Sequence, residues 1–205
     1  MDYAYHVFLS YRRANLWPRW VEKHFYPSFQ HLLDDELGES ARIFYDVRTI
    51  ETGANWPLTL AKAHAESRVL VPLFSSQYFT SEWCVTELSL MQAREERCGF
   101  ATPQNPNGLV VPARVHDGEH YPDSARDIES VDLSRFSNPL MSENSALAEA
   151  LHEAMKRWIP DIVRAISYAP PVCDAAWHAL AVDRFRAVNT QAPRTQLVPR
   201  LAAAS

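Results

Sequence analysis

A glutamate on a predicted helix has the clearest potential for chemistry in this chain. Glu87 lies within Ser81–Leu90, which leads into a helix expected to continue to Arg97. On a helical wheel of about 100° per residue, two apolar strips flank it, formed by Cys84, Leu88 and Met91 and by Trp83 and Leu90. A carboxylate between apolar strips is partly desolvated, which costs stability unless the group is paired or used. The pattern alone leaves two interpretations: an acid that reaches water at the rim of the core, or a functional group.

Two further stretches carry polar side chains next to predicted strands. Arg12 and Arg13 directly follow the apolar run Tyr5–Ser10, and their guanidinium forks suit phosphate oxygens. Asp46–Trp56 is a polar loop that contains Gly53, whose backbone freedom suits a loop. A basic pair after a strand is also common as a solvated turn. Neither stretch therefore identifies a site by itself.

Alternating strands and helices must position these side chains. The predicted strands are short, mainly apolar runs at Tyr5–Ser10, Arg42–Tyr45, Val69–Phe74, Gly108–Val115 and Asp127–Leu133. The predicted helices are Pro18–Leu37, Pro57–Glu66, Ser81–Arg97 and Glu143–Ile166. Gly38 suits the end of the first helix, and Pro160 should bend the last one or end its regular part. Little alternation of apolar and polar residues inside the strands indicates a parallel sheet covered on both faces.

The order of elements predicts an α/β fold. We expect a flavodoxin-like, doubly wound, five-stranded parallel sheet with helices on both faces, over residues 1–168. Ala169-Pro170-Pro171 marks a boundary, and residues 169–205 form a C-terminal helical tail. In this tail we expect one short helix over Cys173–Val188 and then a mobile end, because Asn189–Ser205 is rich in proline, threonine and alanine.

The predicted fold brings the polar stretches together. In open α/β sheets, ligands bind outside the carboxyl ends of the strands. Ser10–Arg13, Asp46–Trp56 and Ser75–Glu87 each follow a predicted strand, so they should meet at one rim of the sheet. With only five glycines in the chain, a Gly-rich phosphate loop of the Rossmann or P-loop type is not expected there.

Composition narrows the classes of function. Apolar residues make up 47% and charged residues 22% of the chain, as in globular proteins. A net charge of −5 argues against general binding to nucleic acid or to anionic membranes. No apolar run approaches the roughly 20 residues that span a bilayer, and Met1–Tyr5 does not resemble a signal peptide. The three scattered cysteines lack metal-ligand spacing and indicate reduced thiols, which predicts a cytoplasmic protein.

Three motifs carry a family resemblance. They are Val-Phe-Leu-Ser-Tyr-Arg-Arg at 7–13, Ile-Phe-Tyr-Asp-Val-Arg-Thr-Ile-Glu-Thr-Gly at 43–53, and Ser-Glu-Trp-Cys-Val-Thr-Glu-Leu at 81–88. In this order and at this spacing they resemble the signature boxes of the TIR (Toll/interleukin-1 receptor) domain family, over about residues 5–165. The resemblance implies the same five-stranded flavodoxin-like fold. It also implies one of two functions: a protein–protein adaptor, or an enzyme that cleaves NAD at its nicotinamide–ribose bond.

The third motif resembles the enzymatic branch of the family, of the bacterial immune type. In enzymatic members the glutamate that closes the Trp-Cys-x-x-Glu box is catalytic, and that position is Glu87 here. The chemistry is reasonable with a single acid. Nicotinamide leaves a cationic ring as a neutral molecule, so no general acid is needed, whereas ordinary glycosidases need two carboxylates. One carboxylate near the ribose can stabilise the oxocarbenium-like sugar that remains.

The resemblance also suggests substrate-binding residues. Ser10, Tyr11, Arg12 and Arg13 follow the first strand, where the arginines are expected to hold the pyrophosphate of NAD. Trp83 is expected either to stack on a ring of the substrate or to cover the sheet edge as a core residue. Glu51 and Trp56 lie on the loop after the second strand and are expected to meet substrate or a neighbouring protomer. This loop departs from the usual family pattern, because Ala54-Asn55-Trp56-Pro57 follows the glycine.

Other reactive residue types give weaker signals. His24, His31 and His64 lie on predicted helices without a second ligand, so we expect no metal site. Cys84 falls on the core stripe and is expected to pack rather than to act as a nucleophile. Ser75 and Ser76 lack a nucleophile-elbow pattern. A receiver or nucleotide sensor of the same fold would need an acidic cluster after the first strand, where none is present.

The sequence thus predicts a cytoplasmic NAD glycohydrolase. NAD is the substrate, no cofactor is expected, and the products are nicotinamide and ADP-ribose or a cyclic ADP-ribose isomer. The expected setting is immune signalling or NAD depletion, such as antiphage defence. By resemblance we expect activation by self-association through TIR–TIR contacts, and a partner effector or sensor protein is a further candidate. Nucleic acid and membranes are not expected as partners. The alternative is a non-catalytic TIR adaptor in which Asp46–Trp56 forms the interface.

Overall fold

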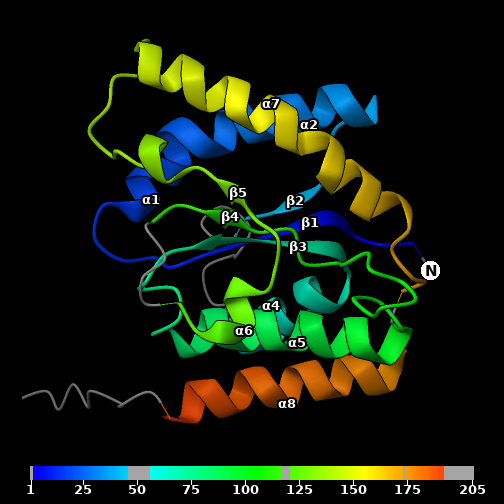
Figure 1. Cartoon of the computed structure of the whole chain (residues 1–205). Helices are drawn as coiled ribbons and strands as arrows, with labels where there is room; N and C mark the ends of the chain where they lie inside the picture. Colours follow the sequence, from blue (N-terminus) through cyan, green and yellow to red (C-terminus); the bar gives the residue numbers. More distant parts are fainter. Residues whose placement is uncertain (1, 46–55, 117–120, 173, 192–205) are drawn as a thin grey trace, which may run out of the picture.

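The computed structural model describes residues 2–45, 56–116, 121–172 and 174–191 (Figure 1). Its sheet contains five strands in the order β2-β1-β3-β4-β5, and every pair of neighbours is parallel. The strands are β1 (Tyr5–Tyr11), β2 (Ile43–Phe44), β3 (Ser67–Phe74), β4 (Ala113–Arg114) and β5 (Val131–Asp132). The order and direction confirm the predicted doubly wound, flavodoxin-like fold.

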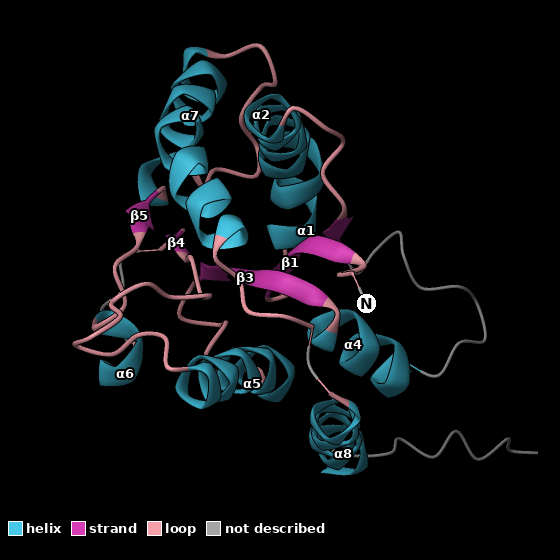
Figure 2. Cartoon of the chain, turned by 90° about the vertical axis from the view of Figure 1, so that its right-hand side faces the viewer, coloured by secondary structure: helices cyan, strands magenta, loops and turns pink. Residues whose placement is uncertain are grey.

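Helices cover both faces of the sheet (Figure 2). One layer contains α1 (Trp17–Trp20), a π-helical segment (Val21–Phe25), α2 (Tyr26–Leu37) and α7 (Ala146–Ser167). The opposite layer contains α4 (Trp56–Ala65), α5 (Glu82–Cys98) and the short α6 (Asp123–Arg126). A 3₁₀ turn, Ser134–Phe136, follows β5. The last helix, α8 (Ala175–Gln191), lies outside α4 and α5 and contacts both.

The alternation of side chains along β1 divides the core into two clusters. Val7, Leu9 and Tyr11 pack in the cluster under α2 and α7. Phe8 packs in the other cluster, which contains residues of α4, α5 and α8. Successive residues of a strand point to opposite faces, so Ser10 shares the face of Phe8 and points toward α5. This parity decides which side chain of β1 can reach Glu87.

The ladder between β3 and β4 is interrupted at a proline. Leu70 bonds to the fourth segment through both its N–H and its C=O, with Leu109 O at 2.8 Å and Val111 N at 2.9 Å. Pro72 points the same way two residues later but has no N–H to continue the ladder. The predicted strand Gly108–Val115 is therefore reduced to a bridge at Val110 and the pair Ala113–Arg114.

The two edge strands are also shorter than predicted. The predicted Arg42–Tyr45 is reduced to β2 (Ile43–Phe44), and the predicted Asp127–Leu133 is reduced to β5. Each lies at an edge of the sheet, where it has one neighbouring strand instead of two. Apolar runs in the sequence mark burial, and burial extends further along the chain than strand pairing does.

The first predicted helix is continuous but not uniform. It runs from Trp17 to Leu37 with five π-helical residues in the middle, Val21–Phe25. Pro27 lies two residues after this segment; its ring nitrogen cannot donate a hydrogen bond, and the ring would clash with the carbonyl one turn earlier. The wider π turn relieves that clash. Gly38 ends the helix at a φ of 70°, as predicted.

The bounds of α5 and α7 lie within three residues of the predicted ones. The N-cap of α5 is Ser81, whose side chain accepts from Cys84 N at 3.4 Å, and Gly99 ends the helix at a φ of 73°. Ser145 caps α7 in the same way. This helix runs through Pro160 to Ser167, so the expectation that Pro160 ends its regular part is wrong.

The C-terminal helix is longer than predicted and begins and ends later. We expected a short helix over Cys173–Val188, and α8 spans Ala175–Gln191. Residue 173 and the expected mobile end from 192 lie outside the described residues. Among the helices that the structure describes, none is long and apolar enough to cross a membrane.

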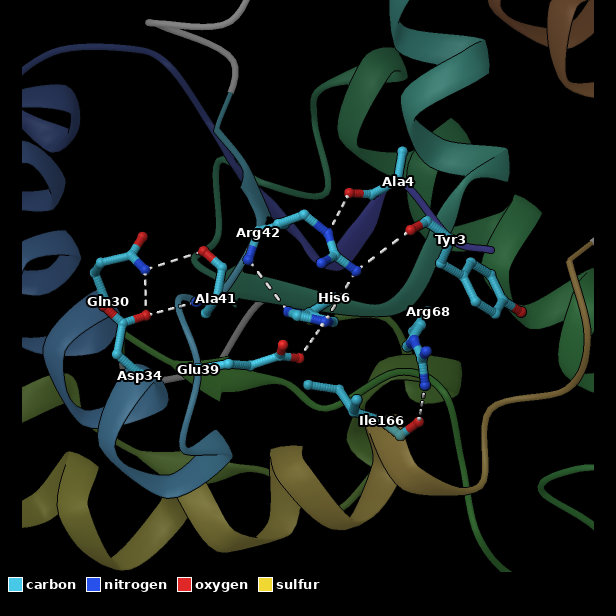
Figure 3. Close-up of polar contacts among 10 residues, drawn as sticks. All are labelled: Tyr3, Ala4, His6, Gln30, Asp34, Glu39, Ala41, Arg42, Arg68 and Ile166. Carbon is cyan, nitrogen blue, oxygen red and sulfur yellow. Dashed lines mark hydrogen bonds and ion pairs between the residues drawn. The ribbon is translucent and has the colours of Figure 1, made fainter. Parts of the chain in front are cut away.

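A polar cluster joins the start of β1 to the α2–β2 connection (Figure 3). His6 Nδ1 accepts from the backbone N–H of Arg42 at 3.2 Å, and His6 Nε2 lies 3.4 Å from Glu39 Oε1. Arg42 Nε donates to Ala4 O at 2.9 Å, and Asp34 Oδ1 accepts from Ala41 N at 2.7 Å. The cluster lies at the amino end of β1, opposite the predicted site, and its contacts are structural.

A buried carboxylate fixes the segment that precedes β4. Glu95 on α5 accepts from Leu109 N at 2.5 Å and from Val110 N at 3.0 Å through one oxygen. Burial raises the pKa of Glu95, and the two backbone donors oppose that rise. The side chain thereby satisfies two N–H groups of a buried, irregular strand.

Replacing this carboxylate tests its structural role. We expect Glu95→Ala to lower the free energy of unfolding by about 2–4 kcal/mol, because two buried donors lose their acceptor. Glu95→Gln keeps an acceptor oxygen and should retain most of the stability. The exposed neighbour Glu96 is the matched control, and Glu96→Ala should change stability by less than about 0.5 kcal/mol. Equal effects of the two alanine variants in urea unfolding would contradict the assignment.

Candidate functional site

A cavity of about 440 Å³ lies at the carboxyl end of β1, beside the starts of α4 and α5. Six of the predicted site residues line it: Tyr11, Arg12, Arg13, Trp56, Trp83 and Glu87. Leu60, Ser81 and Cys84 are the other described residues that line it. The volume falls in the usual range for small-molecule sites. The fold therefore brings together residues that are up to 76 positions apart, between Tyr11 and Glu87.

Glu87 lines the cavity, and its carboxylate is bonded to Ser10, a residue outside the cavity lining. The Glu87 side chain is largely buried, with 7% of the residue surface exposed. Ser10 Oγ donates to Glu87 Oε2 at 2.5 Å. The phenol oxygen of Tyr78 lies 2.9 Å from Ser10 Oγ and 3.1 Å from Cys84 O, to which it donates. A hydroxyl that donates to a buried carboxylate stabilises its ionised form and fixes its orientation.

Ser10 acts behind the carboxylate rather than in the cavity. It is 2% exposed and is absent from the cavity lining, whereas Glu87 is part of it. The sequence placed Ser10 among substrate-binding residues. The geometry instead makes Ser10 the side chain that orients Glu87, because Ser10 lies at a position of β1 that points to the α5 face of the sheet.

The two arginines line the same cavity as Glu87. Arg12 Nη1 donates to Ser81 Oγ at 3.2 Å, which ties the end of β1 to the N-terminus of α5. The Arg13 guanidinium lies over the Trp56 ring at 5.6 Å from its centroid. Each guanidinium has five N–H donors in a planar fork. The pair is therefore placed to hold an anionic group in front of Glu87.

Aromatic rings form the remaining walls. Trp56 and Trp83 meet edge to face, with ring centroids 6.5 Å apart. Tyr11 stacks on Tyr45 at 6.0 Å, and Tyr45 stacks on Tyr26 at 4.5 Å. Burial, together with the hydrogen bond to Tyr45, raises the pKa of Tyr11, so its phenol stays protonated. Planar aromatic walls next to a carboxylate suit a flat heterocycle.

Cys84 packs as the sequence predicted. It is buried on the same strip as Leu88 and Met91, which are also buried. Burial, and then the nearby Glu87, raise the pKa of the Cys84 thiol to about 12. The thiolate is the nucleophilic form of cysteine, so this side chain is inert at neutral pH although it borders the cavity.

His64 supports the helix of Glu87 from the core. It is fully buried on α4, and its Nε2 lies 2.8 Å from the backbone oxygen of Glu87. A carbonyl oxygen only accepts, so Nε2 carries the proton. Burial lowers the pKa of His64 to about 4, an effect that the hydrogen bond to Glu87 partly opposes. His64 is therefore neutral at physiological pH.

Sequence reasoning missed three side chains of this arrangement. Tyr78 lies in the turn after β3, and His64 faces the core from α4. Leu60 lies one turn before His64 on the same helix. A period-2 count along β1 shows that Ser10 points to the α5 face, which would have suggested a partner for Glu87. No pattern in the sequence indicates that Tyr78 contacts Ser10 or that His64 contacts the backbone of Glu87.

Some predicted features are not placed. Glu51 and residues 46–55 of the predicted loop lie outside the described residues. Within the described ranges, no group of three or more His, Cys, Asp or Glu side chains is arranged to hold a metal ion. A larger cavity of about 970 Å³ lies between the turn after β3 and the outer side of α5, lined in part by Phe79, Val85 and Tyr121, and Glu87 does not border it.

Comparison with known proteins identifies the family. A family model described as "TIR domain" matches residues 7–151, which is more than half of the chain. The chain therefore belongs to the TIR domain family, as its three motifs suggested. The match does not distinguish enzymatic from adaptor members, so the NAD-cleaving branch and its bacterial immune type stay predictions. The predicted domain limits at residues 168 and 169 also stay predictions.

Two similar proteins are a resistance protein and the TIR domains of a resistosome. The chain is 35% identical over 86 residues to TMV resistance protein N of Nicotiana glutinosa, and this match covers 42% of the chain. It covers only 7% of the length of that relative. A solved structure, the TIR domains of the activated Roq1 resistosome directly recognizing the pathogen effector XopQ, shares 19% identity at a TM-score of 0.38. That alignment covers 91% of this chain and 98% of the other.

The neutral state of His64 predicts a pH dependence of stability. The folded-state pKa, about 4, lies below the ordinary value of 6.5, so between these values the unfolded chain binds the proton more tightly. Stability is therefore present above pH 6.5 and is lost as the pH falls toward 4. At about 1.4 kcal/mol per pKa unit, the loss is up to about 3 kcal/mol.

His64→Gln isolates this contribution, since glutamine keeps an N–H donor but does not titrate. Urea unfolding between pH 7 and pH 4 should show a steeper fall in the free energy of unfolding for the wild type than for the variant. Contributions from the other histidines and the carboxylates are common to both proteins and cancel. Parallel pH profiles would contradict the low pKa of His64.

Proposed function

We propose that this TIR domain cleaves NAD at the bond between nicotinamide and ribose. One observation carries the proposal: a largely buried carboxylate, Glu87, lies in the wall of a cavity that also contains two arginines and two tryptophans. The cavity thus offers one anionic group, one cationic side and flat aromatic walls. These match the three parts of NAD that must be held: a ribose that becomes cationic, a pyrophosphate and an aromatic ring.

The reaction needs one acid residue. As the bond between C1′ of the ribose and the pyridinium nitrogen breaks, its electron pair goes to the ring, and nicotinamide leaves as a neutral molecule. The ribose that remains carries positive charge on C1′ and the ring oxygen. The Glu87 carboxylate, oriented by Ser10, stabilises that charge. Water then adds at C1′ and loses a proton, which yields ADP-ribose; attack by a group of the same molecule instead yields a cyclic isomer.

The cavity walls account for binding. Arg12 is tied to Ser81 through one nitrogen, and its planar guanidinium carries further donors for pyrophosphate oxygens. Arg13, which lies over Trp56 at the mouth, is the second cation for the same group. Trp83 offers a face for nicotinamide or adenine. In this assignment NAD is the substrate, and the reaction uses no further cofactor.

We place this activity in an immune or NAD-depleting response in the cytoplasm. The relative TMV resistance protein N is named for resistance, which supports an immune setting. Its match with this chain is confined to 7% of its length, so the setting is part of the proposal. The bacterial immune type, with antiphage defence, rests on the resemblance of the third motif to enzymatic members.

Replacement of the carboxylate is the direct test of the activity. We expect Glu87→Gln to reduce nicotinamide release from NAD by at least about 100-fold, because an amide cannot stabilise a cationic sugar by charge. The exposed Glu82 on the same helix is the matched control, and Glu82→Gln should keep activity within about twofold. Free nicotinamide is followed by chromatography with purified protein, in dilute and in crowded solution.

Two results of that assay would reject the enzyme. If Glu87→Gln releases nicotinamide as fast as the wild type, the carboxylate has no role in the chemistry. If neither protein releases nicotinamide in any condition while both fold and self-associate, the adaptor function is favoured. In that case Glu87 is a structural acid that ties α5 to β1 through Ser10.

Self-association is the second testable part of the proposal. In TIR enzymes the loop after the second strand helps to complete the site of a neighbour, and residues 46–56 correspond to that loop by the motif at 43–53. We expect the rate per chain to rise several-fold as the protein concentration crosses the range in which light scattering detects oligomers. A demonstrably monomeric sample that is as active per chain as an assembled one would contradict this expectation.

A further inference from the structure

The last helix touches the back of the cavity. Residues 7–151 make up the family match, so α8 lies entirely outside it. It packs along α4 and α5, the two helices that carry Trp56, His64, Trp83 and Glu87 (Figures 1 and 2). One of its side chains, Phe185, contacts the lining residue Trp83 and is fully buried, with 0% of its surface exposed.

Phe185 lies directly behind the tryptophan of the cavity wall. Its ring stacks on Trp83 with centroids 6.0 Å apart and planes at 20°. Trp83 meets Trp56 edge to face on another side, at 6.5 Å and 86°. An indole packed against one parallel ring and one perpendicular ring has few orientations left. Phe185 therefore limits how Trp83 can present itself to a bound ring.

The same phenylalanine also contacts the support of Glu87. The ring of Phe185 meets His64 edge to face at 6.1 Å. His64 in turn contacts the backbone oxygen of Glu87 through Nε2 at 2.8 Å. One side chain of α8 thus packs against two residues that border or support the carboxylate, although none of the described side chains of α8 lines the cavity.

The start of α8 is anchored away from the cavity. Arg97 forms an ion pair with Asp174 at 2.7 Å and lies over the Trp177 ring at 5.9 Å. Asp174 Oδ1 caps the helix by accepting from Trp177 N at 2.9 Å. The Tyr3 phenol donates to Pro170 O in the preceding linker. These contacts fix one end of α8, and the helix carries Phe185 to the other end, beside the cavity.

From these contacts we propose that Phe185 is a positioning residue for the NAD site. It holds Trp83 in the orientation in which the indole stacks on a ring of the substrate, so α8 is part of the enzyme although it lies beyond the family match. The inference rests on the proposed function. It assigns to the C-terminal helix a role in substrate binding rather than in the chemical step.

The test uses a change that keeps the helix packed. Phe185→Leu preserves much of the apolar volume, whereas alanine would leave a large cavity in the core. We expect KM for NAD to rise about three- to tenfold with kcat within about twofold. Leu180 on the same helix is 39% exposed, and Leu180→Ala is the control that should leave both constants within twofold. Circular dichroism verifies that the variants are folded at the assay temperature.

A double-mutant cycle separates positioning from a general loss of stability. If Phe185 acts through Trp83, Phe185→Leu raises KM in the wild type but adds less than twofold in a Trp83→Ala background. Fully additive effects would overturn the inference. So would an unchanged KM in folded Phe185→Leu, or a rise in KM of the same size in Leu180→Ala.

A readout without catalysis keeps this inference separate from the proposed activity. Protein labelled with 5-fluorotryptophan gives a fluorine resonance for Trp83, assigned by its loss in Trp83→Phe. We expect one sharp resonance in the wild type and in Leu180→Ala, and a broadened or split one in Phe185→Leu. A sharp single resonance in Phe185→Leu would overturn the positioning role. A wild type that never releases nicotinamide would overturn the proposed function, whatever the resonance shows.

Discussion

The hydrogen bond from Ser10 to Glu87 is the contact on which the candidate site depends. It joins the end of the first strand to the first turns of α5, across 77 positions of sequence. A carboxylate that is 7% exposed would be costly without such a donor. The donor also restricts the orientation of the carboxylate. The site exists because a strand and a helix meet at one point with complementary groups.

The doubly wound sheet explains why that point is where it is. Parallel strands place their carboxyl ends at one edge, and the following turns must gather there. The turn after β1 brings Arg12, and the segment after β3 brings Ser81 and then Glu87 on α5, so basic and acidic groups line the same cavity. Arg12 and Ser81 are themselves bonded at 3.2 Å. The order of strands and helices therefore brings the residues of the candidate site together, and the helices on both faces hold the sheet edge in place.

The C-terminal helix adds a third layer to one side of this arrangement. Phe185 reaches between Trp83 and His64 and completes the apolar cluster under α4 and α5. Without it, the indole of Trp83 would have no ring stacked on this face. The proposed role of Phe185 would place a positioning residue of the candidate site in a segment that the family match does not include.

The amino-acid sequence by itself determined the class of fold, the family and most residues of the cavity. Apolar runs, caps such as Ser81 and Gly38, and three motifs suffice for these, because they are local patterns. The sequence did not determine the short length of β4, where Pro72 has no N–H to continue the ladder, or the π segment before Pro27. Nor did it pair Glu87 with Ser10, or place Tyr78, His64 and Phe185 behind the site. Those contacts join distant segments, and only the packing of the sheet and helices decides which side chains meet.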